Sequence, residues 1–310
     1  MSKQIKILAI DGGGVKGVAS AKFLEQLELA GNLTLYNKFD MIAGTSTGGL
    51  IALYIALKKA TGTECVELFS QENIDRIMDK SVWDKLLPMQ DRPKYDGVGK
   101  TKVITENFGN VRLGDLEKKV LVTAYDIVLR RIVVFKSFGG TDCDYNPTVA
   151  EVAEATSAAP TFFPTVKTSD SPPRWLIDGG MAANNPSMCA LVEAMKMGYK
   201  PEEIKLLSIG TGLQVRGKDI ADDIGKRSQK WGSVEWFFNG IMEHFFAANT
   251  SATTYHCQKV LGDNFLRVNG PLIYCSDDMD ETKPGNVNNL QLLGKEWFKE
   301  FGHEALEFLK

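Results

Sequence analysis

The chain has 310 residues, of which 44% are hydrophobic and 24% charged, and this composition is typical of a globular enzyme. It excludes disordered, collagenous and coiled-coil proteins. A chain of this length can bury a full core without disulfides or metal ions, so stability requires no cofactor and we expect none. The net charge of −3 excludes a strongly positive surface, and we expect no nucleic-acid polymer as a partner.

The cysteine pattern and the hydrophobic runs favour a cytosolic location. The five cysteines are widely spaced and form no C-x-x-C pair, so they predict neither a disulfide framework nor a zinc site. The first apolar run, at 5–10, is interrupted by Lys6 and is too short for the core of a signal peptide. Nowhere do eighteen consecutive apolar residues occur, so we expect peripheral membrane contact only.

Two strand-turn-helix units follow one another in the first sixty residues. The second helix has no polar face, which predicts a central position. Because such units place parallel strands side by side with helices on both faces, we expect a three-layer α/β/α fold around a mostly parallel sheet. The strand, turn and helix of the first unit are predicted at 6–10, 11–17 and 19–30, and those of the second at 39–43, 44–48 and 50–57.

The pattern loosens at about 64–116 into polar helical pieces, which predict a lid-like insertion over one end of the sheet, with 88–99 as the candidate lid. Strands and helices alternate again up to Gly212, so we expect one continuous core domain at 5–212. Its remaining strands are predicted at 120–125, 132–135, 175–177 and 205–209, and its helices at 149–158 and 188–197.

The last part of the chain, 213–310, is expected to form a mainly helical extension packed on the core. It has an aromatic-rich helix at 233–248, a short strand at 265–268 and an amphipathic helix at 290–309. The aromatic residues have two readings: contact with a lipid headgroup layer or an acyl groove, and packing on the core or in a homo-oligomer contact, which we favour. They are Trp231, Trp236, Phe237, Phe238, Ile241, Met242, Phe245 and Phe246.

The turn Gly44-Thr45-Ser46-Thr47-Gly48 matches the pattern G-x-S-x-G. A strand precedes it and an apolar helix follows, which is the setting in which a sharp turn exposes a nucleophilic serine. The alternative is a plain turn in which Ser46 caps the helix, and the motif alone does not decide between the two.

A serine nucleophile requires a base, usually a histidine held by a carboxylate. The three histidines all lie beyond the predicted core: His244, His256 and His303. Asp178 follows the strand at 175–177, so it should project from the same carboxyl-terminal sheet edge as Ser46, and burial would make it a better base. The alternative is a common Asp-Gly turn.

The glycine loop at 11–17 also has two readings. Gly12, Gly14 and Gly17 satisfy G-x-G-x-x-G between a strand and a helix, which is typical of a dinucleotide site. However, Asp11 would repel a pyrophosphate, and the acidic residue expected at the end of the next strand is missing. The second reading is an anion-binding nest of the backbone N–H groups of Gly12 to Gly14, with positive potential from Lys16.

Together, the sequences at 11–17, 44–49 and 178–180 resemble the three signatures of the patatin-like phospholipases, in the same order and at similar spacing. The likeness covers about 5–212. The chain resembles the plant and bacterial branch of the family in having a lysine at position 16, where other members carry arginine. Further similar stretches are Lys94-Tyr-Asp-Gly97, Thr123-Ala-Tyr-Asp126, 155–160 leading into Phe163-Pro164, and Asn184-Asn-Pro186.

The resemblance implies a lipid acyl hydrolase that uses a Ser-Asp dyad and needs no metal. It implies Ser46 as nucleophile, Asp178 as base and the amides of Gly12, Gly13 and Gly14 as the oxyanion hole. The remaining motif residues support these groups: Lys16, Gly17, Gly44, Gly48, Gly179 and Gly180. The acidic cluster at 277–281 lacks the spacing of a calcium loop, and we expect a solvated turn there.

The resemblance also extends to bacterial antiphage effectors that a cyclic dinucleotide activates and that then degrade membrane phospholipid. A cytosolic hydrolase that contacts the membrane peripherally when active fits that description. Two alternatives stay open: a dinucleotide-dependent enzyme that uses the glycine loop, and a non-catalytic lipid-binding or storage protein with the same fold.

Overall fold

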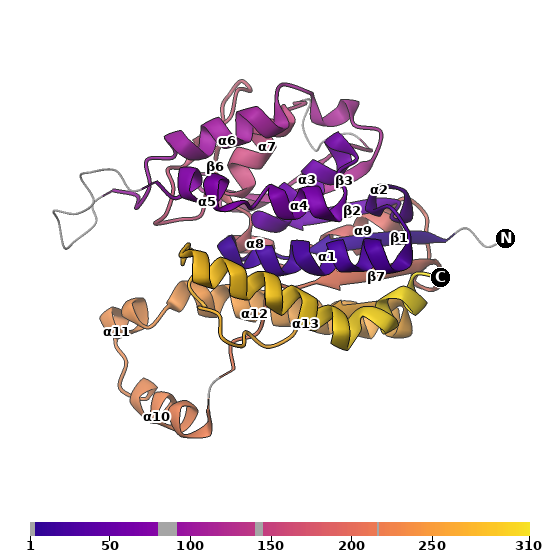
Figure 1. The fold of residues 1–310 in the computed structure, drawn as a ribbon. Coiled ribbons are helices and arrows are strands. Elements are labelled where there is room, and N and C mark those ends of the chain that lie inside the picture. Colours follow the sequence, from indigo (N-terminus) through magenta and orange to yellow (C-terminus); the bar gives the residue numbers. More distant parts are fainter. Residues whose placement is uncertain (1–3, 80–91, 140–144, 216) are drawn as a thin grey trace.

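The computed structural model describes residues 4–79, 92–139, 145–215 and 217–310. Within these residues one sheet of eight strands runs through the molecule (Figure 1). Strand β4 pairs with β3, and the other strands form a single row. In spatial order the row is β5 (Val166–Lys167), β6 (Trp175–Asp178), β3 (Lys119–Asp126), β2 (Met41–Thr45), β1 (Ile5–Ile10), β7 (Ile204–Ile209) and β8 (Phe265–Val268), and β4 is Arg131–Lys136.

Five consecutive strands of the row are parallel: β3, β2, β1, β7 and β8. Strands β4, β5 and β6 pair antiparallel to their neighbours. Strand β1 shows why helices must cover both faces. Leu8 and Ile10 point to one hydrophobic cluster, and Ile7 and Ala9 point to another on the opposite face. The predicted mostly parallel, three-layer architecture is therefore confirmed.

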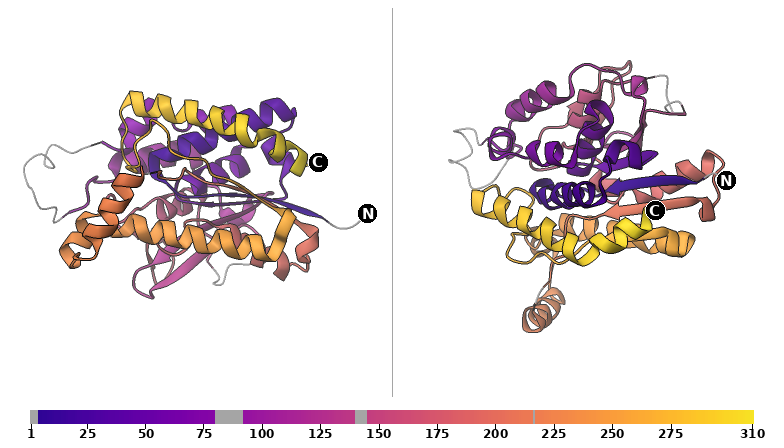
Figure 2. Two further views of the ribbon diagram at one scale, coloured as in Figure 1. Left: turned by 90° about the horizontal axis from the view of Figure 1, so that it is seen from below. Right: turned by 45° about the vertical axis from the view of Figure 1, so that its right-hand side comes forward.

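Helices of the N-terminal half and the last helix cover one face, and α9 and α12 cover the other (Figure 2). The first face carries α1 (Gly17–Gly31), α2 (Leu35–Lys38), α3 (Thr47–Lys58), α4 (Gly62–Glu67), α5 (Gln71–Ile77), α6 (Val98–Phe108), α7 (Val149–Thr156) and α13 (Pro284–Phe308). The second carries α9 (Ser187–Lys196) and α12 (Ile241–Leu261), and the short helix α8 (Gly180–Ala183) follows β6.

The part of the chain after Gly212 differs from expectation in two ways. Strand β8 pairs in parallel with β7, so the sheet continues beyond the predicted core boundary. The predicted single helix at 233–248 is two helices, α11 (Ser233–Phe238) and α12, because Gly240 has a left-handed φ of 78° that ends any helical path. Helix α10 (Lys218–Ser228) precedes them, has no buried residue and stands away from the sheet with α11 (Figure 1).

The described side chains of the aromatic segment are partly covered or exposed in this chain, so they do not belong to its buried core. None of those at 231–246 is buried, and Phe245 is 59% exposed. The side chains of Phe237 and Phe238 lie outside the described set. Elsewhere in the extension, Cys257 and Leu261 of α12 and Trp297 of α13 are buried in the two clusters.

Candidate active site

Ser46 occupies the sharp turn between β2 and α3. Its φ of 53° and ψ of −125° are unusual for a residue with a side chain. Its N–H donates to Thr156 Oγ1 at 2.8 Å, and that hydroxyl donates to the carbonyl of Thr123 at 2.7 Å. The turn is therefore tied to both β3 and α7.

The glycines of this turn allow close backbone contacts. A Cβ on Gly44 would lie 2.2 Å from the carbonyl oxygen of Gly48, and a Cβ on Gly48 would lie 2.2 Å from that of Ile10. Any side chain would push α3 away from β1 and β2, so these glycines hold the helix start against the strand ends. Gly17 and Gly179 have the same role, since a Cβ would meet Thr47 and the backbone of Thr123, respectively.

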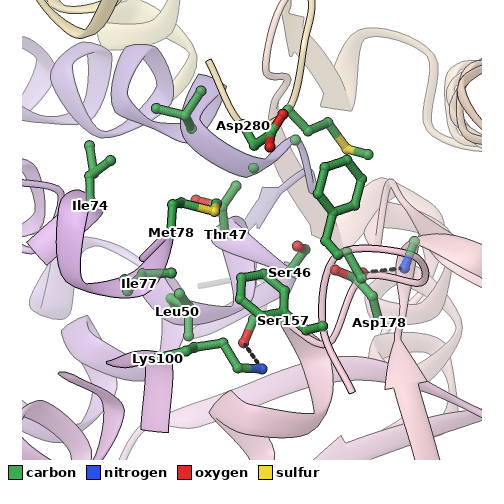
Figure 3. A pocket seen from close by; sticks show the side chains of 18 of the residues that line it. Ser46, Thr47, Leu50, Ile74, Ile77, Met78, Lys100, Ser157, Asp178 and Asp280 are labelled. Carbon is green, nitrogen blue, oxygen red and sulfur yellow. Dashed lines mark hydrogen bonds between the residues drawn. The ribbon is translucent and has the colours of Figure 1, made fainter. Parts of the chain in front are cut away.

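Asp178 lies beside Ser46, but the strand that carries it runs in the direction opposite to the one that we assumed from the sequence. The predicted shared edge assumed a parallel strand, but β6 is antiparallel to β3. Strand β2 ends with Thr45 opposite Thr123, and β6 arrives from the opposite direction and ends with Asp178 opposite Ala124. The two strands thus end at adjacent positions of β3, and this places the carboxylate beside the serine (Figure 3).

The surroundings of Asp178 favour a carboxylate that can accept a proton near neutral pH. The side chain is buried, and burial raises its pKa to about 6. Hydrogen bonds from the Ser46 side chain and from the Gly180 N–H, the latter at 2.8 Å, oppose this effect, as does the charge of Lys100. No histidine takes part, because His244, His256 and His303 are exposed and none lines the pocket.

The glycine loop borders the same pocket, but not all of its backbone N–H groups are free to bind an oxyanion. The Gly12 N–H donates to the carbonyl of Asn184 at 3.0 Å, so the prediction that Gly12 serves as an oxyanion donor is wrong for this conformation. Gly13 and Gly14 line the pocket, and Gly14 has a left-handed φ of 60°. Lys16 points elsewhere and donates to the carbonyl of Asp277 at 2.7 Å.

The pocket that contains Ser46 and Asp178 is strongly apolar and has a volume of about 90 Å³. The segment predicted as an insertion supplies most of one wall, with α5, α6 and the residues beside them (Figure 3). The part of the predicted lid at 88–91 lies outside the described residues. The apolar lining comprises Val15, Leu50, Phe69, Ile74, Ile77, Met78, Ile104, Phe162, Phe163, Phe246 and Met279.

Lys100 is the buried cation of this pocket, and sequence reasoning missed it. Its ammonium pairs with Glu154 at 3.0 Å, donates to Ser157 Oγ at 3.4 Å and lies 4.8 Å from the ring centre of Phe163. Burial lowers the pKa of Lys100, and the Glu154 charge opposes that shift. A single lysine in a polar helix carries no local signal of this kind.

The acidic cluster at 277–281 is only in part the solvated turn that we predicted, since Asp277 and Asp278 are exposed but Asp280 is not. Asp280 and Met279 line the pocket, and the Tyr95 hydroxyl donates to Asp280 Oδ2 at 2.5 Å. Lys94 forms an ion pair with the same carboxylate. The motif Lys94-Tyr-Asp-Gly97 was visible in the sequence, but its partner 185 residues away was not.

Among the described residues, no group of three or more His, Cys, Asp or Glu side chains is arranged to hold a metal ion. In the same part of the chain, no helix combines the length and apolar character needed to cross a membrane.

Comparison with known proteins gives the family of the chain. Residues 8–191 match the family model described as patatin-like phospholipase. Patatin-like protein 2 of Oryza sativa subsp. indica is 29% identical over 348 residues, which cover 94% of this chain and 83% of the relative. The cGAMP-activated phospholipase of Pseudomonas aeruginosa is 30% identical over 270 residues, with 84% and 77% covered. The solved structure of VipD from Legionella pneumophila matches 95% of this chain and 67% of its own, at 13% identity and a TM-score of 0.45.

The fold and the family match define an enzyme of the lipid acyl hydrolase class, that is, a carboxylic ester hydrolase. The chain belongs to the patatin-like phospholipase family.

Proposed function

We propose that the protein hydrolyses fatty-acyl esters of membrane phospholipids with Ser46 as nucleophile and Asp178 as base. The observation that carries this proposal is the buried carboxylate, with a pKa of about 6, beside a serine in a strained turn of an apolar pocket. The apolar walls suit an acyl chain.

The reaction has two halves. The Ser46 hydroxyl passes its proton to Asp178 as its oxygen bonds to the ester carbonyl carbon, and the N–H groups of Gly13 and Gly14 stabilise the oxyanion. The C–O bond to the glycerol breaks, the proton on Asp178 moves to the departing alkoxide, and an acyl-serine remains. Water then gives a proton to Asp178 and attacks the acyl-serine, which releases the fatty acid and restores the Ser46 hydroxyl.

The direct test is fatty-acid release from mixed phospholipid liposomes by wild type, Ser46→Ala and Asp178→Asn. We expect release by wild type and loss of at least about a thousandfold in both variants. Lipid binding that Ser46→Ala leaves unchanged, without turnover by wild type, would instead support the lipid-binding alternative. A nicotinamide or flavin absorbance in the purified protein would support the dinucleotide alternative.

We propose further that the activity is regulated by a cyclic dinucleotide and serves an antiphage effector that contacts the membrane peripherally. The similarity to the cGAMP-activated phospholipase supports this part. Fatty-acid release should therefore rise when one cyclic dinucleotide is added, and a flat response to all of them would refute the regulation.

A further inference from the structure

The loop between β3 and β4 carries exposed apolar side chains, and we name residues 127–132 the hairpin tip. Ile127, Val128, Leu129 and Ile132 are all exposed. Single exposed apolar residues are normal on protein surfaces, whereas contiguous ones mark contact sites. Trp175, at the start of β6, is also exposed and lies beside the tip, because its carbonyl accepts from the Ile127 N–H at 3.1 Å. No step of the proposed hydrolysis uses these residues.

The hairpin tip projects beyond the dyad at the same end of the sheet. Strand β3 continues past the end of β2 and pairs there with β6, which places Ala124 opposite Asp178. Ile127 follows Ala124 by three residues, so the tip begins roughly 10 Å beyond the level of Asp178, at a rise of about 3.3 Å per residue. A surface that contacts the tip therefore faces the end of the sheet at which Ser46 lies.

The backbone of the tip is arranged so that its side chains can leave water. Asp126 is buried, and its Oδ1 accepts hydrogen bonds from the N–H groups of Val128 and Leu129, both at 2.9 Å. Unsatisfied N–H groups would be costly in an apolar medium. Arg130 has a left-handed φ of 51°, which glycine or asparagine adopts more easily. The turn thus keeps a cation where another residue would suit the backbone better.

The cations around the tip are free to bind an anionic surface. Arg130 and Arg131 are exposed, and neither forms an ion pair within the part of the chain that the structure describes. Lys167 of β5 is exposed as well and pairs in register with Trp175. Its ammonium lies 5.7 Å from the ring centre of that tryptophan.

The acids of the neighbouring loops do not cancel these charges. Residues 127–132 include no acid, and the carboxylate of Asp126 is turned inward. In the loop after β5, Asp170 pairs with Arg174, and Glu151 of α7 accepts from the N–H and the hydroxyl of Ser169. Apolar side chains at the tip, a tryptophan beside them and unpaired cations around them match the interface of an anionic bilayer.

We propose that the hairpin tip docks the enzyme on an anionic phospholipid bilayer. Ile127, Val128 and Leu129 enter the headgroup layer, and Arg130 and Arg131 bind lipid phosphates. The inference deepens the proposed hydrolase and rests on it, because docking here brings the catalytic end of the sheet to the membrane that holds the substrate. A contact with a second copy of the chain is the alternative that the experiment separates.

Vesicle binding tests the docking without turnover. The Ser46→Ala protein is sedimented with vesicles of phosphatidylcholine, alone or mixed with phosphatidylglycerol. Val128→Gln with Leu129→Gln should weaken binding to the anionic vesicles by at least about tenfold, because two apolar side chains no longer enter the bilayer. The matched control is Leu29→Gln with Val192→Gln, since these side chains are 66% and 52% exposed on α1 and α9. The proposal is overturned if the parent binds no vesicle, or if the tip variant binds as tightly as the control.

Arg130→Gln with Arg131→Gln tests the charges. This pair should weaken binding to the anionic vesicles by about tenfold or more and leave binding to phosphatidylcholine vesicles unchanged. Lys196→Gln with Lys295→Gln removes the same net charge from exposed positions on α9 and α13 and should bind as the parent does. Equal losses in the two pairs would mean that only net charge matters, which overturns the role of the tip arginines.

Hydrolysis separates docking from catalysis. With Ser46 present, Val128→Gln with Leu129→Gln should release fatty acid from anionic vesicles at least about tenfold more slowly and hydrolyse a soluble short-chain ester as wild type does. Equal losses on both substrates would overturn the docking role. Self-association that the tip variant abolishes, without vesicle binding, would also overturn it and assign the tip to a contact between copies. Absence of hydrolysis by wild type, with tip-dependent vesicle binding intact, would support the docking and count against the proposed hydrolase.

Discussion

Arg267 of β8 binds the carboxylate of Asp11 with both terminal nitrogens of its guanidinium group. Nη1 lies 2.9 Å from Oδ1 and Nη2 lies 2.5 Å from Oδ2, and Nη1 also donates to Ser208 Oγ at 2.7 Å. The two partners are 256 residues apart, and both side chains are largely shielded from water. The part of the chain after the family match thus fixes the first residue of the glycine loop.

Replacement of Arg267 should destabilise the protein strongly. Arg267→Met leaves the Asp11 carboxylate buried without its partner, which typically costs about 3–5 kcal/mol of unfolding free energy. Asp11→Asn in the same chain removes the uncompensated charge and should recover part of the loss. Urea unfolding of both variants gives the two values. A single variant within about 1 kcal/mol of wild type would show that the pair contributes little.

The residues around Ser46 show which parts of the site the sequence could predict. Ser46 and the glycine loop were predictable because each lies in a short strand-turn-helix pattern whose geometry is local. Asp178 was placed beside Ser46 on the assumption of a parallel strand, whereas β6 is antiparallel and too short for its direction to be read from its residues.

Contacts between distant segments left no local pattern. Arg267 on β8 meets Asp11, and Asp280 meets Tyr95, only after the chain has folded, because the partners are 256 and 185 residues apart in the sequence. The occupied Gly12 N–H was hidden for the same reason, because its acceptor is a backbone carbonyl of another segment. Backbone acceptors carry no residue-type signal.

The activity should depend on pH through Asp178. Its pKa is raised to about 6, and only the ionised form can accept the Ser46 proton, so kcat/KM should fall as the pH drops through about 6. Ester hydrolysis measured from pH 4.5 to 8.5 gives this limb. A rate that stays constant down to pH 4.5 would contradict Asp178 as the base.

Lys100 should set the position of that limb. Its positive charge lowers the pKa of Asp178, so Lys100→Met should move the acid limb to higher pH. Lys100→Arg keeps the charge and should leave the limb near that of wild type. A merely structural role of Lys100 would change the maximal rate without moving the limb, and the pH profile distinguishes the two.

Asp178→Asn should stabilise the protein at neutral pH while abolishing activity. The folded-state pKa of about 6 lies above the ordinary value of 3.8, so folding favours the protonated form. The favourable contribution is complete below pH 3.8 and is lost as the pH rises through about 6, which amounts to about 3 kcal/mol. Asparagine avoids this loss, and its side-chain oxygen can still accept from the Gly180 N–H.

Urea unfolding of Asp178→Asn and wild type at pH 4 and pH 8 measures this effect. The variant should gain stability at pH 8 and lose most of that gain at pH 4. Asp278→Asn changes an exposed carboxylate and is the control, with no comparable gain expected. A gain of the same size at both pH values would mean that packing rather than ionisation is responsible.

Ser46 should carry a cost in backbone strain. Its left-handed φ of 53° is unfavourable for any residue with a Cβ and easy for glycine, and such strain costs about 1–3 kcal/mol. Ser46→Ala keeps the strain and loses the hydroxyl, whereas Ser46→Gly loses both. After the larger chain entropy of unfolded glycine is subtracted, Ser46→Gly should be more stable than Ser46→Ala by about 1 kcal/mol.

The comparison between these two variants isolates the backbone, because both lack the Oγ that bonds to Asp178 and both should be inactive. Urea unfolding at pH 8 provides the difference in unfolding free energy. If Ser46→Ala is the more stable of the two, the backbone of the turn is not strained, and the packing of α3 against β1 is enough to hold Ser46 in its position. If Ser46→Gly is the more stable, the native serine is kept at the expense of stability, as expected for a residue retained for catalysis.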